Sequence, residues 1–507
     1  MDSTGSPGVG SRILRALGFV LVWLVVAVPT WLVLFTHSSA DTVVASHDAV
    51  VSPRLDGKVQ LDMGPYLPDV LLPSEGPIGV TVAVGKTTAD SGAELAQRYA
   101  AIAAHPAAEQ QRVREEITDL AQHTAIQAAV IGLVPIGLWL LLGRRRRAEL
   151  LHLDKRVLVA VPVVLAVAVV LVVQPWRSDE ERVQSTVWLP IQDAVPDITV
   201  PQELTRWKIQ GGLFTNDTHR LLKSAFDTYA KSKVFYRDVA DRVDEVTDQL
   251  HQPAEGETVA VLVSDRHDNI GMDSVVREVA DAAGATVVLD AGDDTSTGET
   301  WEEFSLDSLD KAFKGYDDRV FVAGNHDNGT FVARHLKSLG WTHLDGQPVE
   351  PFGSVRITGV DDPRSSGLGN WRDETGLTFA EVKQTIADDV CKLDEQGDRI
   401  ATLLVHDANL GASALERGCT DLVLAGHLHV QVGPARVVGE NGKAGYTYTN
   451  GTTGGAAYAV AIGSKLRRDA EFTFVTYRDG RPAGIQPVTV KTTGVISVAR
   501  YIPLDLG

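Results

Sequence analysis

Short apolar runs recur through the second half of the chain, and each ends in Asp, Asn or His. Such runs are typical of buried parallel strands, which carry chemistry at the carboxyl edge of an open α/β sheet. The terminal residues are, in chain order, Asp265 with His267, Asp293, Asn325 with His326, His406, and His427 with His429. We expect two carboxylates, one amide and four imidazoles from this set to converge on one edge. Such a group of side chains suits two adjacent metal ions.

The order of these motifs is D-x-H, G-D, G-N-H-D, a single His and G-H-x-H. In this order they resemble the calcineurin-like metallophosphoesterases, over roughly residues 257–456. The resemblance implies a metallophosphoesterase-like α/β sandwich, with two packed sheets flanked by helices. It also implies two divalent metal ions, and imidazole, carboxylate and amide ligands suit Mn, Fe or Zn.

The resemblance further assigns a role to each residue. Asp265, His267 and His429 would hold one metal ion, Asn325, His406 and His427 would hold the other, and Asp293 would bridge them. Paired ions of this kind convert a bridging water into hydroxide and offset the charge of the transition state. His326 matches a family position that is not a ligand, where the imidazole contacts the phosphate. Its implied role is either an acid that protonates the leaving group or an electrostatic stabiliser.

Two positions depart from the family pattern. Many relatives have an acidic residue at Ser296 and a small apolar residue at Arg266, so we expect altered tuning of the site rather than loss of metal. Arg266 is a candidate for the substrate rim. Arg364 follows another strand-like run and is a candidate bidentate donor to a phosphate oxygen, although pairing with a neighbouring Asp explains it equally well.

Three apolar stretches, at residues 17–35, 125–142 and 157–173, predict transmembrane helices. The first is long enough to cross a hydrocarbon core of about 30 Å, and its alternative interpretation is a cleaved signal peptide. Hydrophobic residues make up 44% of the chain, which agrees with a part that lies in a membrane. The basic residues 144–147 predict a cytoplasmic loop. The region after residue 173 is then expected on the extracytoplasmic face.

These patterns predict five regions along the chain. They are a cytoplasmic amino terminus with the first transmembrane helix (1–40), an extracytoplasmic β-rich module with a helical return (41–123), transmembrane helices two and three (124–177), a connector with a long amphipathic helix (178–256), and the metallophosphoesterase domain (257–507). We expect the helix at 217–250 to pack on a domain, with a lid as the alternative. Residues 446–449 and 471–477 are expected to form strands of a second sheet.

Cysteine is scarce, because the chain contains only Cys391 and Cys419. No thiolate metal site is therefore available. The two residues are equally compatible with a disulfide, which an extracytoplasmic location would permit, and with two buried thiols.

The net charge of −19 argues against a broad surface for binding a phosphate backbone, so no nucleic acid partner is expected. The sequence instead predicts a multi-pass, membrane-anchored phosphoesterase. It would hydrolyse a phosphomonoester or phosphodiester through a metal-bound hydroxide, and its location makes lipid or envelope phosphates candidate substrates. The alternative is a catalytically silent envelope scaffold that binds partners and retains the metal site.

Overall fold

The computed structural model describes residues 9–44, 47–63, 69–73, 76–87, 106–143, 145–147, 188–190, 193, 208–210, 231–366, 376–456 and 465–507. The chain divides into two compact units. The first comprises residues 1–89 and 106–219, and the second comprises residues 90–105 and 220–507. Each unit is described by itself.

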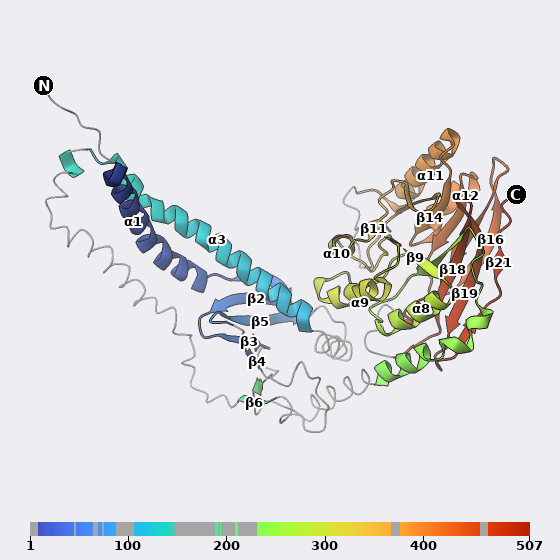
Figure 1. Ribbon diagram of the computed structural model, residues 1–507, viewed down its shortest axis with the longest axis horizontal. Helices are drawn as coiled ribbons and strands as arrows, with labels where there is room; N and C mark the ends of the chain where they lie inside the picture. Colours follow the sequence, from blue (N-terminus) through green and yellow to red (C-terminus); the bar gives the residue numbers. More distant parts are fainter. Residues whose placement is uncertain are drawn as a thin grey trace. The chain divides into compact units, whose positions relative to one another are not determined.

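Two long helices of the first unit, α1 (Val9–Thr36) and α3 (Pro106–Leu141), lie side by side (Figure 1). The Trp23 indole N–H donates to the carbonyl of Ala129 at 2.9 Å, and that of Trp31 donates to Ala121 at 3.1 Å. Because the partner numbers fall as the Trp numbers rise, the helices are antiparallel. Gly132 permits the close approach, since a Cβ there would lie 2.9 Å from the Ala27 side chain.

The same unit contains a sheet in the order β1-β2-β5-β3-β4-β7-β6. Its strands are β1 (Ala40–Val44), β2 (His47–Arg54), β3 (Lys58–Asp62), β4 (Val70–Pro73), β5 (Gly79–Thr87), β6 (Trp188–Pro190) and β7 (Lys208–Gln210). Strands β1 to β5 lie between the first two apolar stretches of the sequence. The sheet also gains β6 and β7 from the segment that the sequence predicts as a connector, since β4 pairs antiparallel with β7.

Two sheets form the centre of the second unit. The first has the order β11-β10-β9-β8-β18-β19-β20, with β21 paired to β19, and the second has the order β12-β13-β14-β15-β17-β16. The strands of the first are β8 (Glu257–Val263), β9 (Ala285–Asp290), β10 (Asp318–Phe321), β11 (Thr342–His343), β18 (Ala470–Arg478), β19 (Arg481–Val490), β20 (Ile496–Val498) and β21 (Ile502–Pro503). Those of the second are β12 (Val349–Phe352), β13 (Val355–Val360), β14 (Ile400–Val405), β15 (Thr420–Ala425), β16 (Val432–Val438) and β17 (Ala444–Thr449).

Apolar side chains on both faces of these strands build a layered core. In β8, Val259 and Val261 pack with the helices, whereas Ala260 and Leu262 pack with the second sheet, as the two-residue repeat of a strand requires. Helices α8 (Gly271–Ala282), α9 (Glu303–Phe313) and α10 (Phe331–Ser338) share a core with the first sheet. Helices α11 (Phe379–Gln396) and α12 (Ala408–Glu416) cover the second (Figure 1). The predicted α/β architecture of packed sheets and flanking helices is confirmed.

Two predicted elements differ from those in the structure. Residues 471–477 lie in β18, which belongs to the first sheet because it pairs antiparallel with β8, while residues 446–449 lie in the second sheet as predicted. The predicted helix at 217–250 is helical over 231–240 and then tightens into two 3-10 turns, Val243–Glu245 and Thr247–Gln249. The three-residue spacing of the buried Val243 and Val246 fits this tighter winding.

The described part of that segment packs on the second unit, because Tyr236 and Val239 belong to the core formed by the first sheet and its helices. Residues 217–230 lie outside the described residues. So does the third predicted transmembrane helix, at 157–173. Among the described residues, two helical stretches, Ala16–Thr36 and Glu109–Leu141, are long and apolar enough to cross a membrane.

The alternative left open for the two cysteines is resolved in favour of a disulfide. Cys391 in α11 is bonded to Cys419, which directly precedes β15. The bond therefore ties a covering helix to the start of a central strand.

Candidate metal centre

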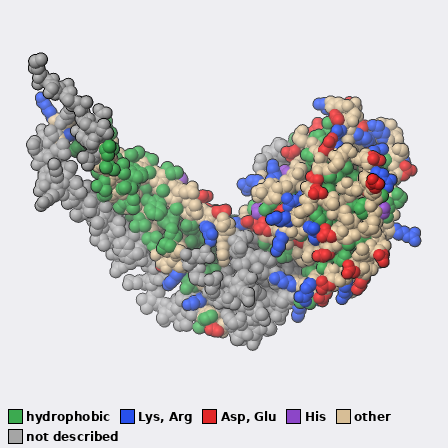
Figure 2. All heavy atoms as spheres, in the orientation of Figure 1, with side chains coloured by type: hydrophobic (Ala, Val, Ile, Leu, Met, Phe, Trp, Pro, Cys, Tyr) green, Lys and Arg blue, Asp and Glu red, His purple; other side chains and the backbone are tan. Residues whose placement is uncertain are grey.

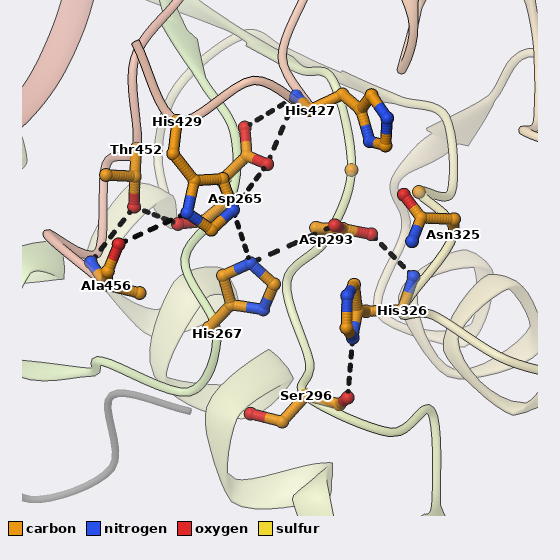
Figure 3. Close-up of polar contacts among 12 residues, drawn as sticks. Asp265, His267, Asp293, Ser296, Asn325, His326, His427, His429, Thr452 and Ala456 are labelled. Atoms are coloured by element: carbon orange, nitrogen blue, oxygen red, sulfur yellow. Dashed lines mark hydrogen bonds and ion pairs between the residues drawn. The ribbon is translucent and has the colours of Figure 1, made fainter. Parts of the chain in front are cut away.

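The predicted site residues follow strands of both sheets. Asp265 and His267 come after β8, Asp293 after β9, and Asn325 and His326 after β10, whereas His406 follows β14 and His427 and His429 follow β15. The expectation of one common sheet edge is therefore wrong, because β14 and β15 belong to the second sheet. The residues still meet. Asp265, His267, Asp293, Asn325, His427 and His429 lie around one site (Figure 3), and His406 lies 3.2 Å from Asp293.

The backbone at this junction is strained. Left-handed φ angles occur at Asp265, His267, Asp268, Asp293, His427 and His429. Non-glycine residues in this conformation cost about 1 to 3 kcal/mol each, and they persist only where the surrounding structure holds them. These turns let residues that directly follow a strand point their side chains back over the sheet edge.

Two glycines allow the loops to pass close to one another. A Cβ at Gly426 would lie 2.5 Å from a carboxylate oxygen of Asp265. A Cβ at Gly292 would lie 2.2 Å from the backbone nitrogen of Gly324. The glycines of the G-D and G-H-x-H motifs thus serve close packing between the loops that carry the candidate ligands.

The first predicted ligand set, Asp265, His267 and His429, is closely gathered (Figure 3). His267 Nε2 lies 3.0 Å from His429 Nε2, which is 3.3 Å from Asp265 Oδ1. The second imidazole nitrogen of His429 lies 3.2 Å from the Ala456 carbonyl and can donate to it. That bond leaves the His429 Nε2 lone pair directed at the other two side chains.

The second predicted set is centred on His406. Its Nδ1 lies 2.7 Å from the carbonyl of Ala291, to which it donates, and this bond leaves a lone pair on Nε2. That Nε2 lies 3.2 Å from Asp293 Oδ2 and 3.1 Å from Asn325 Oδ1. When Nε2 carries no proton, these three atoms are all electron-rich and repel one another. The donor set therefore fits a positive charge, as a proton on Nε2 or as a metal ion.

His427, the third residue assigned to the second set, is less closely gathered. Its Nε2 lies 3.9 Å from Asp407 Oδ2, and its side chain is 29% exposed. Its backbone N–H instead donates to both carboxylate oxygens of Asp265, at 3.0 and 3.1 Å. His427 therefore positions Asp265 through its main chain, while its ring remains open to solvent.

The electrostatic field at the centre favours positive charge. Burial would lower the pKa of His406, but the Asp293 carboxylate outweighs this effect and raises the pKa to about 10. The same pair shifts the pKa of Asp293 downward, against the effect of burial. By contrast, burial lowers the pKa of His267 to about 3, which keeps its imidazole neutral and able to act as a ligand.

His326 is positioned differently from the candidate ligands. Its backbone N–H donates to Asp293 Oδ1 at 2.7 Å, and its ring Nδ1 lies 3.0 Å from the carbonyl of Ser296, to which it can donate (Figure 3). Ser296 thus orients His326 through its main chain, a role that residue type alone does not reveal. The Ser296 hydroxyl donates to the buried Asp268 at 2.5 Å.

Arg266 does not line a rim, because its side chain is 1% exposed. Its guanidinium donates to both carboxylate oxygens of Asp273, at 2.7 to 2.9 Å, and to Asp294 at 3.1 Å. We therefore correct the expectation of a substrate contact: Arg266 joins the loop after β8 to the loop after β9 and to α8.

Arg364 adopts the paired arrangement that was its alternative interpretation. It donates to Asp362 at 2.6 and 3.0 Å and to Asp407 at 2.8 Å. Its guanidinium also stacks on Phe379, 4.4 Å from the ring centroid. The carboxylates of Asp362 and Asp407 thus offset the positive charge of the Arg364 guanidinium, which a contact with phosphate would require.

Residues 213–431 match the family model described as calcineurin-like phosphoesterase, a range that includes every candidate ligand from Asp265 to His429. The chain therefore carries a metallophosphoesterase domain, and it is a phosphate ester hydrolase. This family uses divalent metal ions, and the grouped Asp and His side chains offer candidate ligands for them.

Solved structures also resemble the chain. The protein TT1561 of Thermus thermophilus is 10% identical with a TM-score of 0.30, and the match covers 48% of this chain and 98% of that chain. A structure described as a novel archaeal phosphodiesterase is 13% identical with a TM-score of 0.27, and the match covers 43% of this chain and 93% of that chain. No curated protein matches the sequence.

Proposed function

We propose that the protein is a membrane-anchored phosphoesterase with two divalent metal ions, which hydrolyses a phosphomonoester or phosphodiester on the extracytoplasmic face. The observation that carries the hydrolytic part is the convergence of His406 Nε2 with Asp293 Oδ2 and Asn325 Oδ1, at 3.2 and 3.1 Å. The second cluster, of Asp265, His267 and His429, supports a second cation position. His267 Nε2 in this cluster lies 3.9 Å from Oδ2 of the same Asp293.

The proposed ligands are Asp265, His267 and His429 for one ion, Asn325, His406 and His427 for the other, and Asp293 for both. When bound, such ions would activate a shared water as the nucleophile and offset charge on the phosphate. His326 is then the proton donor to the leaving group. Its Nδ1 is held by the Ser296 carbonyl, so Nε2 is the ring atom left to face the substrate.

Metal analysis and phosphate release test this proposal together. The full-length protein should contain close to two divalent ions per chain and hydrolyse p-nitrophenyl phosphate or its diester. His406→Ala should lose metal and activity, whereas His123→Ala, which removes an exposed histidine of α3, should retain both. Bound metal without hydrolysis of any phosphate ester would favour the silent scaffold instead.

The anchoring part of the proposal is supported by the surface of α1 and α3. Hydrophobic side chains gather along these helices (Figure 2). Only 6% of the most apolar stretch of α1 and 17% of that of α3 is buried. A core helix of a soluble protein would be mostly buried, so this exposure favours contact with lipid. The indole bonds of Trp23 and Trp31 to α3 also make α1 a packed part of the unit rather than a separate leader.

The pairing of β4 with β7 supports a further crossing. Strands β1 to β5 lie between α1 and α3 in the chain, so a membrane that contains both helices has these strands on one side and residues 145–147 on the other. Strand β7 pairs with β4 on the first side. This pairing supports a return of the chain across the membrane, for which we propose the apolar stretch 157–173.

The proposed extracytoplasmic location of the phosphoesterase unit is supported by the disulfide, because such bonds persist in oxidising compartments. A reporter fused after Gly507 should score as extracytoplasmic, and one inserted within residues 144–155 as cytoplasmic. A cytoplasmic score for the carboxyl terminus would contradict the proposed topology and leave the hydrolytic proposal intact.

A further inference from the structure

We propose that the site takes phosphate esters whose alcohol carries an alkyl or acyl chain, and that this chain lies along an apolar ridge made by Leu428, Val430 and Val432. The proposal rests on the proposed phosphoesterase function, whose substrate class it names. The ridge begins between two candidate metal ligands, because Leu428 lies between His427 and His429.

The ridge is exposed in an alternating pattern. Leu428 is 55% exposed, and Val430 and Val432 are each 50% exposed, whereas the residues between them, His429 and Gln431, are partly buried. The backbone is bent here, because His427 and His429 have left-handed φ angles of 75° and 55°. The exposed fractions nevertheless show three aliphatic side chains that face solvent one after another, from the metal centre to the start of β16, while His429 lies in the metal centre.

The ridge carries no charged side chain. It leads from Leu428, between two candidate ligands, to Val432 at the start of β16. Residues 428–435 contain no Asp, Glu, Lys or Arg. A sugar or nucleoside alcohol would find no charged partner along this segment, whereas an apolar chain would cover aliphatic carbon that is otherwise in contact with water.

Pairing with a strand of a second copy fits this edge less well. Strand β16 ends the order of the second sheet, but its register with β17 shifts between Val432 and Ala435. Pro434 within this irregular stretch has no backbone N–H to donate. Bulges and prolines of this kind protect an edge strand from a further strand, so the exposed side chains favour a ligand over a paired partner.

Competition between two soluble substrates tests the ridge. Ethyl phosphate and n-octyl phosphate, the latter below its micelle concentration, are offered together to the full-length protein, and the ratio of their kcat/KM values is measured. This ratio does not depend on the fraction of active enzyme. We expect octyl phosphate to be preferred by about tenfold or more, since methylene groups in apolar contacts discriminate at that level.

Replacing Val430→Ser and Val432→Ser together should reduce the preference to about twofold or less, because the octyl chain loses its apolar contacts. The matched control is Val438→Ser, which changes an equally exposed valine at the opposite end of β16 and should keep the wild-type ratio. Vesicles that contain phosphatidic acid distinguish the source of the substrate. Their hydrolysis points to a membrane lipid, and hydrolysis of octyl phosphate alone points to a soluble amphiphile.

An octyl preference that is absent in the wild type, or that survives in the double variant, would overturn the ridge proposal. So would a wild-type dimer that the double variant dissociates without a change in the ratio, because the ridge would then be an interface between copies. Failure of the proposed function has a different signature, which is the absence of phosphate release from every ester tested.

Discussion

The two halves of the candidate metal centre differ in how completely the protein positions them. Asp265, His267 and His429 already lie with their donor atoms within 4.8 Å of one another, and two of these side chains are fully buried. In the other half, Asn325 and His406 are gathered around Asp293, but the ring of His427 lies beside Asp407 and is partly exposed. One half is preorganised, whereas the other contains a proposed ligand, His427, whose ring would have to move to join the others.

The difference follows from the supports behind each half. The buried guanidinium of Arg266 joins the two loops that carry Asp265 and Asp293, and the Thr452 hydroxyl donates to the Asp265 carbonyl at 2.7 Å. His427 has support of this kind only for its backbone, which is bonded to Asp265. A substrate that displaces solvent near His427 would therefore complete the second half, whereas the first half requires no rearrangement.

The bridge between the halves should be the most sensitive position. Asp293→Ala is expected to lower metal content at both positions and to reduce hydrolysis to the uncatalysed rate, because this carboxylate is the proposed bridge and lies near both His267 and His406. Metal analysis and p-nitrophenyl phosphate hydrolysis would measure the effect. Asp317→Ala, at an exposed carboxylate before β10, is the control. Retention of one tightly bound ion would show that the halves do not share Asp293.

Neighbouring residues of the G-N-H-D motif should separate metal binding from proton transfer. Asn325→Ala should lower occupancy of the second position as well as activity, because its amide oxygen lies 3.1 Å from His406 Nε2. His326→Ala should leave two ions bound and reduce hydrolysis by roughly 10² to 10⁴, the usual contribution of a positioned proton donor.

A comparison of substrates with different leaving groups tests the role of His326 further. The loss in His326→Ala should be smaller for p-nitrophenyl phosphate, whose leaving group needs little protonation, than for an alkyl phosphate. Equal losses would make His326 a stabiliser of charge rather than a proton donor. Loss of an ion from this variant would make it a ligand.

Much of the centre could be predicted because ligand types at strand ends, in a particular order, constrain one another. The distribution of the strands between sheets could not, since an apolar run such as β14 or β18 does not specify its neighbour. Arg266 was misassigned because a charged residue between two ligands is ordinarily expected at the surface. The role of Ser296 was missed because its carbonyl acts, and every residue has one. Strands β6 and β7 have three residues each, too few to show a period.

Removal of the Arg266 support should weaken the preorganised half. Arg266→Ala leaves Asp273 and Asp294 without their buried partner, which should cost about 3 to 5 kcal/mol of stability. Affinity for the ion at Asp265 and His267 should fall by about 10- to 100-fold, the usual effect of losing a group that orients ligands. Arg266→Lys keeps the charge without the planar fork and should show an intermediate loss of affinity. Unchanged metal affinity in a folded variant would show that Arg266 contributes to the stability of the fold and not to the positioning of the ligands.

Metal titration should distinguish the two halves directly. Mn²⁺ added to metal-free protein is expected to bind in two phases separated by about tenfold, because ordering the His427 side chain costs about 0.5 to 1.5 kcal/mol. His267→Ala should abolish the tighter phase, and His427→Ala the weaker one. Two equal affinities, or loss of the tighter phase in His427→Ala, would show that the difference in geometry has no consequence for binding.

Removal of the disulfide is expected to have the smallest effect on metal binding, although it should lower the free energy of unfolding considerably. Cys391 and Cys419 lie 28 positions apart, and closing a loop of this size stabilises a fold by about 3 to 4 kcal/mol on the chain-entropy view. The disulfide is at the amino-terminal end of β15, whereas His427 and His429 follow the carboxyl-terminal end of this strand. Replacing both cysteines with serine should therefore lower the unfolding midpoint in denaturant while both phases of Mn²⁺ binding remain. Single replacements should destabilise to a similar extent, and reductant should reproduce the effect in the wild type. If the double variant instead lost only the weaker phase of Mn²⁺ binding, the disulfide would contribute to the position of His427. The weaker affinity of the second half would then depend on β15, which precedes His427, rather than on the solvent exposure of the His427 ring.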